Sequence, residues 1–149
     1  MKTKFLLLIC LIGLGGCVQE DNGSLPSPTE TIEIERSYSE IKDYELDLDN
    51  CFIIEQEDYY LYFYSTTCSH CEELKNFIIA EALDRKDIFF IKSSNKIQLT
   101  NDRDLVIGAE NPGDISILGY PTLLKIDSGK CIKNCVGNSE IKSELNSYH

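Results

Sequence analysis

The sequence is poor in basic residues. It holds 14 lysines and arginines against 25 aspartates and glutamates, which gives a net charge of −11. A chain with this balance repels polyanions, so nucleic acid and an anionic membrane face are poor binding partners, and we expect no nucleic acid to bind.

The sequence also lacks internal repeats and an apolar run long enough to span a bilayer, which takes about 20 residues. The apolar run Phe5–Leu14 instead follows Lys2 and Lys4 and leads into Leu14-Gly15-Gly16-Cys17, which resembles a lipobox. This pattern predicts a lipoprotein signal peptide over residues 1–16, with Cys17 lipidated and N-terminal after cleavage. An ordinary secretory signal is the alternative, and either signal exports the chain. Loss of the two lysines with the signal would change the net charge from −11 to −13.

Residues 17–37 are predicted to form a disordered tether, because this acidic tract is rich in glycine, serine and proline and has little to bury. Its reach is about 20–25 Å. Residues 38–149 then form one domain, long enough for an ordinary core without obligatory crosslinks. We expect an extracytoplasmic domain, held at the bacterial cell membrane through the lipid anchor only.

The stretch Tyr59–Arg85 predicts a strand followed directly by a helix. Tyr59–Tyr64 is aromatic and aliphatic, which is typical of a strand buried on both faces. Thr66-Thr67 offers hydroxyls to the free N–H groups of a helix, along which apolar residues recur at helical spacing. Cys68 and Cys71 lie on its first turn, where two cysteines three apart can form a disulfide. A Cys68 thiolate would face the positive end of the helix dipole, which favours the ionised form.

Cys68-Ser69-His70-Cys71, placed between a strand and a helix, resembles the redox motif of the thioredoxin superfamily. A second stretch agrees, because Leu118–Leu124 (LGYPTLL) resembles that family's cis-proline loop. Asp127–Lys130 and Val136-Gly137 resemble its hairpin turn and closing strand. The resemblance covers about Tyr38–Tyr148. It implies an α/β, thioredoxin-like fold with a central mixed β-sheet flanked by helices, and it places the proline beside the two cysteines.

The resemblance also implies roles for the residues of the site. Cys68 is expected to attack a substrate disulfide and Cys71 to resolve the mixed disulfide. His70 is expected to stabilise the Cys68 thiolate and make the disulfide more oxidising, although a lone histidine is also typical of a plain surface position. Tyr120 would offer its backbone to a substrate chain beside a cis-Pro121, for which a trans proline opening an edge strand is the alternative. Because tyrosine is bulkier than the residue usual there, we expect a partly occupied or differently selective groove.

Tyr62 marks a departure from the family pattern. Many relatives carry a buried acidic residue six positions before the first cysteine, as a proton acceptor, and Tyr62 holds that position here. A tyrosine with the reference pKa of about 10 is not a base at neutral pH. Proton transfer would therefore use water or another group.

Three further cysteines fall within the predicted domain. Cys131 and Cys135 are four apart on one predicted strand, about 13 Å between Cα atoms, so they should not bridge each other unless a bulge or turn intervenes. Cys51 pairs with one of them or all three are buried thiols. Zinc held by the CxxC cysteines with Cys131 or Cys135 fits on ligand type alone, but export disfavours it. We expect neither a metal nor another cofactor.

The other elements are read from local patterns. Tyr38–Leu48 predicts a short helix or strand, and Asp49 or Asn50 could cap a helix through Cys51–Ile54. Ile88–Ile91 predicts a strand.

In the second half of the chain, the clearest patterns of secondary structure lie near the C-terminal end. One helix is expected within Asn101–Ala109, followed by a turn at Asn111-Pro112-Gly113. Leu123–Ile126 and Ile132–Val136 predict a hairpin around Ser128-Gly129, and Ser139–Tyr148 predicts a final amphipathic helix.

These features favour a membrane-tethered thiol–disulfide oxidoreductase that exchanges a Cys68–Cys71 disulfide with protein substrates, leaning towards an oxidant or isomerase. Such an oxidoreductase could exchange electrons with a redox partner in the membrane. The alternative is a non-catalytic binding or accessory module with a structural disulfide. The segment FYSTTCSHC also resembles the active-site strand of bacteriocin-accessory proteins, a narrower version of the first hypothesis.

Overall fold

A computed structural model of the protein describes residues 34–147. The predicted signal peptide, the lipidation site Cys17 and most of the predicted tether lie outside the described residues. Within residues 34–147, no helix has both the length and the apolar character needed to cross a membrane.

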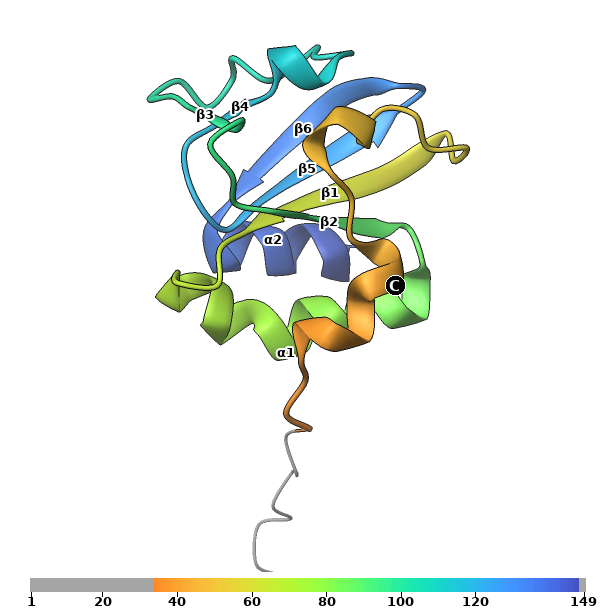
Figure 1. The fold of residues 1–149 in the computed structure, drawn as a ribbon, viewed down its shortest axis with the longest axis vertical. Coiled ribbons are helices and arrows are strands. Elements are labelled where there is room, and N and C mark those ends of the chain that lie inside the picture. The colour runs from red at the N-terminus through yellow and green to blue at the C-terminus, as the bar shows by residue number, and fades with distance from the viewer. Residues whose placement is uncertain (1–33, 148–149) are drawn as a thin grey trace, which may run out of the picture. The chain divides into compact units, whose positions relative to one another are not determined.

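A four-stranded mixed sheet forms the centre of the domain, with strand order β2-β1-β5-β6 (Figure 1). The strands are β1 (Asp58–Tyr64), β2 (Ile88–Lys92), β5 (Thr122–Asp127) and β6 (Lys130–Val136). β1 pairs in parallel with β2 and antiparallel with β5, and β5 pairs antiparallel with β6. The predicted buried strand is confirmed, because every residue from Tyr59 to Tyr64 is buried between two neighbouring strands.

The connections between strands follow from their direction. The parallel pair β1–β2 needs a long crossover, and α1 (Ser69–Arg85) supplies it as predicted. The antiparallel pair β5–β6 is closed by a two-residue turn in which Ser128 and Gly129 have φ of 51° and 76°. Positive φ at both central residues matches the twist of the flanking strands, so the predicted hairpin is confirmed.

One face of the sheet is covered by α1 and by α2 (Gly137–Asn146), which lie together below the strands in Figure 1. Leu74 and Ile78 of α1 and Ile141 and Leu145 of α2 are fully buried in this core. The α/β class and the mixed sheet with its helices are as expected, and the final helix begins two residues before its predicted start at Ser139.

The opposite face carries a second core, covered by the connection between β2 and β5. This connection contains β3 (Gln98–Leu99), η3 (Pro112–Asp114) and β4 (Ser116–Ile117), and β3 pairs in parallel with β4. The turn expected at Asn111–Gly113 is thus a 3₁₀ turn that begins after Asn111.

The helix predicted within Asn101–Ala109 is wrong, because these residues form consecutive turns. Two features explain the difference. The Asp102 carboxylate accepts a hydrogen bond from the Asp104 N–H at 3.0 Å, which competes with helix formation. The backbone also pairs with β6 instead of with itself, since the Gly108 N–H donates to the Cys131 carbonyl at 2.7 Å and the Cys131 N–H donates to the Ala109 carbonyl at 2.8 Å.

Between Ile34 and the start of β1, the helices are both of the 3₁₀ type, η1 (Tyr38–Tyr44) and η2 (Leu48–Asn50). A capping box between Ser37 and Glu40 begins η1, in agreement with the expected short helix or strand. The helix predicted through Cys51–Ile54 is wrong. The Tyr59 hydroxyl donates a hydrogen bond of 2.8 Å to the Cys51 carbonyl, so this acceptor is used by β1 rather than by a following helical turn.

A β-bulge separates Cys131 from Cys135. The register passes from the pair Lys125–Lys133 to the pair Ile126–Cys131, which leaves one extra residue on β6. Side chains four apart on a regular strand share a face, but the bulge puts Cys135 in the core under the helices and Cys131 in the opposite core. These two cysteines and Cys51 are buried free thiols in this structure.

Candidate active site

Cys68 is the N-cap residue of α1. Its backbone is extended, with φ of −95° and ψ of 118°, and its sulfur accepts a hydrogen bond from the Cys71 N–H at 3.2 Å. Thr66 and Thr67 were expected to satisfy the free N–H groups of this helix, and that prediction is wrong. The Thr67 hydroxyl bonds to the Ser65 hydroxyl instead, and the cysteine sulfur itself is the cap.

The two cysteines of the motif differ in exposure. Cys68 is partly exposed, whereas Cys71 on the first turn of α1 is fully buried. Burial, together with a hydrogen bond to Cys68, raises the pKa of the Cys71 thiol to about 12. Among the five cysteines of residues 34–147, Cys68 is therefore the one that a bulky partner can reach.

The proline loop lies against Cys68. The Tyr120–Pro121 peptide bond is cis, as expected, and the Cys68 thiol donates a hydrogen bond of 3.4 Å to the Tyr120 carbonyl. The Thr122 hydroxyl donates to the Gly119 carbonyl at 2.8 Å and so holds the loop at the start of β5. The fold thus brings together two motifs that are about fifty positions apart in the sequence.

Tyr120 occupies the position expected to receive a substrate backbone. Its ring is half-buried and packs against both cores, and burial raises the pKa of its hydroxyl. The ring therefore belongs partly to the interior. The expected effect of Tyr120 on the selectivity of a substrate groove stays a prediction.

His70 lies on the exposed surface of the first helical turn. Its side chain is 70% exposed and its Nδ1 lies 3.4 Å from Oε2 of Glu73, which also accepts a hydrogen bond from the Asn138 amide at 3.1 Å. This chain of contacts links the motif to α2. In the described part of the chain no hydrogen bond joins His70 to Cys68, and the role of His70 in stabilising the thiolate stays a prediction.

Tyr62 lies in the same core as Cys71. It holds the position at which many thioredoxin relatives carry a buried acid, as noted from the sequence. The side chain is fully buried, and burial raises the pKa of its hydroxyl above the usual value, so the phenol stays protonated. The Tyr38 hydroxyl is buried as well, and neither hydroxyl has a hydrogen-bond partner within residues 34–147. Burial raises the pKa of both tyrosines, and the neighbouring Cys71 adds to the effect. No local pattern singles out Tyr38, because only the packing of η1 brings its ring against the core that contains Cys71.

No metal site is built around the motif. Within residues 34–147, no three histidine, cysteine, aspartate or glutamate side chains are grouped closely enough to hold a metal ion.

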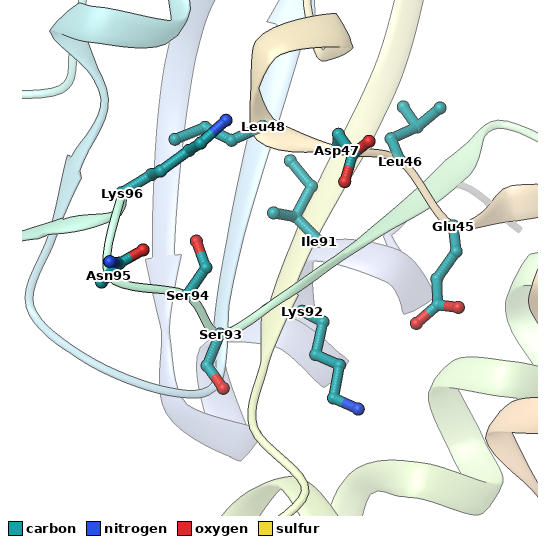
Figure 2. A pocket seen from close by; sticks show the side chains of 10 residues that line it. All are labelled: Glu45, Leu46, Asp47, Leu48, Ile91, Lys92, Ser93, Ser94, Asn95 and Lys96. Carbon is teal, nitrogen blue, oxygen red and sulfur yellow. The ribbon is translucent and has the colours of Figure 1, made fainter.

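A surface hollow of about 410 Å³ lies elsewhere, between the segment after η1 and the end of β2 (Figure 2). Asp47, Ser94 and Lys96 surround Ile91 there and point in different directions. Neither cysteine of the motif lines this hollow, so the chemistry of the chain is not placed in it.

Comparison with known proteins gives structural likeness without sequence matches. No family model matches the chain and no curated protein matches it. Mitochondrial thioredoxin 3 from Saccharomyces cerevisiae is 18% identical, with a TM-score of 0.44 over 69% of this chain and 92% of that one. Thioredoxin F from spinach chloroplast is 16% identical, with a TM-score of 0.47 over 76% and 95% of the two chains. Plasmodium falciparum thioredoxin is 17% identical, with a TM-score of 0.46 over 70% and 98%.

These identities and TM-scores transfer no activity to this chain, so its function has to be argued from its own site. The topology of the chain can be described from its own structure, without the comparisons. The mixed sheet has the CxxC at the start of its crossover helix and the cis-proline before β5. That is the thioredoxin-like arrangement expected from the sequence.

Proposed function

We propose that the chain is a thiol–disulfide oxidoreductase that exchanges a Cys68–Cys71 disulfide with protein substrates. The observation that carries the proposal is the asymmetry of the motif. Cys68 is partly exposed at the start of α1 and contacts the cis-proline loop, while Cys71 is buried one turn further on. An accessible attacking thiol with a protected second thiol is what a two-step exchange requires.

The exchange conserves atoms and electrons in both directions. As an oxidant, the Cys68–Cys71 disulfide is attacked at Cys68 by a substrate thiolate, and Cys71 leaves as a thiolate. A second substrate thiolate then attacks the mixed disulfide, so the substrate becomes oxidised and Cys68 is released reduced. The proposed direction is towards oxidant or isomerase, because Tyr62 holds the position at which many thioredoxin relatives carry a buried acid, and His70 lies between the cysteines.

The proposed place of action is outside the cytoplasm, where thiols tend to be oxidised. It rests on the sequence pattern that ends at Cys17, which would anchor the domain to the membrane by a lipid. Protein thiols would then be its substrates, and a membrane redox partner would reoxidise it.

A non-catalytic binding module with a structural disulfide is the second candidate. The complete burial of Cys71 favours it, because only the Cys68 side of such a bond is open to attack. The two candidates differ in redox potential, since structural disulfides have potentials below about −300 mV while exchange proteins range from about −270 to −120 mV.

Equilibration of the full chain against glutathione buffers of graded potential tests the proposal. Alkylation of the remaining thiols and mass mapping would give the oxidised fraction of the Cys68–Cys71 pair. We expect a midpoint nearer the isomerase value of about −180 mV than the thioredoxin value of about −270 mV. Cys71→Ser is the control, because it removes the internal disulfide and keeps Cys68. A pair that stays oxidised below about −300 mV would favour the binding module.

A further inference from the structure

The Glu73 carboxylate links His70 of the motif to the start of α2. One of its oxygens, Oε2, lies 3.4 Å from Nδ1 of His70 and accepts a hydrogen bond of 3.1 Å from the Asn138 side-chain amide. His70 and Glu73 are three positions apart on α1, whereas Asn138 lies 65 residues further along the chain than Glu73. The contact between His70 and Glu73 therefore has a third partner, which tertiary packing supplies.

The start of α2 is also fixed to the other half of the site. The Gly137 N–H donates a hydrogen bond of 3.0 Å to the carbonyl of the cis-proline, Pro121. Asn138, the next residue, is partly buried, and its Oδ1 is inaccessible to solvent. An isolated surface ion pair loses most of its value to the entropy of holding two side chains. Here the carboxylate is held by a residue that the fold already fixes, so less of this entropy is lost when His70 binds.

The contact with Glu73 decides where the His70 imidazole points. A thiolate on Cys68 would be stabilised by an imidazolium beside it. Nδ1 of His70 is directed to Glu73 instead, and within residues 34–147 no hydrogen bond joins His70 to Cys68. The negative charge of Glu73 also balances the positive charge of a protonated His70. Through both effects, Glu73 limits the stabilisation that His70 can give to the thiolate.

Stabilisation of the Cys68 thiolate changes the redox equilibrium of the Cys68–Cys71 pair. The thiolate exists only in the reduced form, so a group that stabilises it favours reduction and makes the disulfide a stronger oxidant. A group that holds the imidazole away from the thiolate has the opposite effect. It lowers the reduction potential.

We propose that Glu73, positioned by Asn138, sets the reduction potential of the Cys68–Cys71 pair by holding the His70 imidazole away from Cys68. The inference rests on the proposed function, because the potential matters only if the pair exchanges with substrates. Glu73 is a positioning residue, since it acts through His70. Once its carboxylate is removed, the imidazole is free to donate a hydrogen bond to the Cys68 thiolate, and the potential rises.

A cycle of four full-length proteins in glutathione buffers tests the proposal: wild type, Glu73→Gln, His70→Ala and the double variant. Alkylation and mass mapping would give the oxidised fraction of the Cys68–Cys71 pair at each buffer potential. Glu73→Gln should raise the equilibrium constant for reduction of the pair by about threefold, which an exposed ion pair can supply. That change equals about 14 mV at 29.6 mV per tenfold. In the His70→Ala background, the same substitution should have less than half this effect.

Glu72→Gln is the matched control for the removed charge. The Glu72 and Glu73 side chains are 64% and 63% exposed on the same helical turn, but Glu72 pairs with Lys75. The effect of Glu72→Gln on the potential should therefore be the same with and without His70. Asn138→Ala keeps every charge and removes the amide that holds Glu73. It should raise the potential by less than Glu73→Gln does.

The possible results separate the inference from the proposed function. Equal effects of Glu73→Gln with and without His70 would overturn the inference, because the carboxylate would then act by its charge alone. A lower potential in Glu73→Gln, or an unchanged potential in Asn138→Ala, would overturn it as well. In each of these results the wild-type pair still exchanges with glutathione, so the proposed function stands. A wild-type pair that does not exchange would remove the proposed function and the inference together.

Discussion

Replacement of Cys68 tests the finding that this sulfur caps α1. Cys68→Ser keeps a hydrogen-bond acceptor at the N-cap, whereas Cys68→Ala removes it and leaves the Cys71 N–H without its 3.2 Å partner. Because Cys71 is fully buried, water cannot readily replace that partner. Loss of an N-cap side chain costs about 0.5–2 kcal/mol, and a buried donor left unpaired costs about 1–3 kcal/mol.

These two figures describe the same lost bond, so the alanine variant should be about 1–2 kcal/mol less stable than the serine variant. For a domain of about 100 residues, each kcal/mol of lost stability lowers the Tm by roughly 4–8 °C. Urea and thermal unfolding of both variants under reducing conditions would measure it. Both lack the attacking thiol, so a redox difference cannot account for the result.

Ser69→Ala is the matched control for this comparison. Ser69 is exposed at the next position of α1, and its hydroxyl caps nothing. Its replacement should change the free energy of unfolding by less than about 0.5 kcal/mol. An alanine variant at position 68 as stable as the serine variant would refute the assignment of the sulfur as cap.

Three further predictions concern pH, His70 and the anchor. Burial raises the pKa of Cys51 to about 12 and those of Cys131 and Cys135 to about 11, from an ordinary value of 9.0. The folded state therefore holds these protons more tightly than the unfolded state, so this stability is present below about pH 9 and should fall as the pH rises towards 11–12, measured by urea unfolding of the reduced chain. His70→Pro should lower the reduction potential of the Cys68–Cys71 pair in glutathione buffers, each 30 mV corresponding to about 1.4 kcal/mol, and an unchanged potential would make His70 a bystander. Cys17→Ser should release the domain from membranes with its thiol chemistry intact, and a variant that stays with membranes after a salt wash would refute the predicted lipid anchor.

The parts of the fold that the sequence predicted correctly are those with local signals. Tyr59–Tyr64 is uniformly apolar or aromatic, α1 has helical spacing, and Ser128-Gly129 marks a two-residue hairpin. In these three cases the deciding interactions lie within a few residues of one another, so the pattern is visible without the tertiary structure. The cis bond before Pro121 was instead predicted from the resemblance of Leu118–Leu124 to a known cis-proline loop, and the structure agrees.

The parts that could not be predicted depend on contacts between distant segments. The Asn101–Ala109 backbone bonds to Cys131 on the edge of β6 rather than to itself, which no local pattern announces. The bulge that separates Cys131 from Cys135 likewise arises from pairing with β5. Tyr38 reaches Cys71 only because η1 packs on the sheet.

Competitive alkylation tests the central claim most directly, because that claim assigns attack to Cys68 and resolution to the buried Cys71. Reduced full-length protein would be treated with iodoacetamide at about pH 6, where the thiolate alone reacts, and labelled positions would be mapped by mass over time. Urea-unfolded protein is the control, in which all cysteines should label at similar rates. We predict that Cys68 is labelled well before Cys71, Cys51, Cys131 and Cys135, because it is the partly exposed one of the five and lies at the start of α1. Labelling of Cys71 at the same rate as Cys68, or of Cys51 or Cys131 first, would contradict the account.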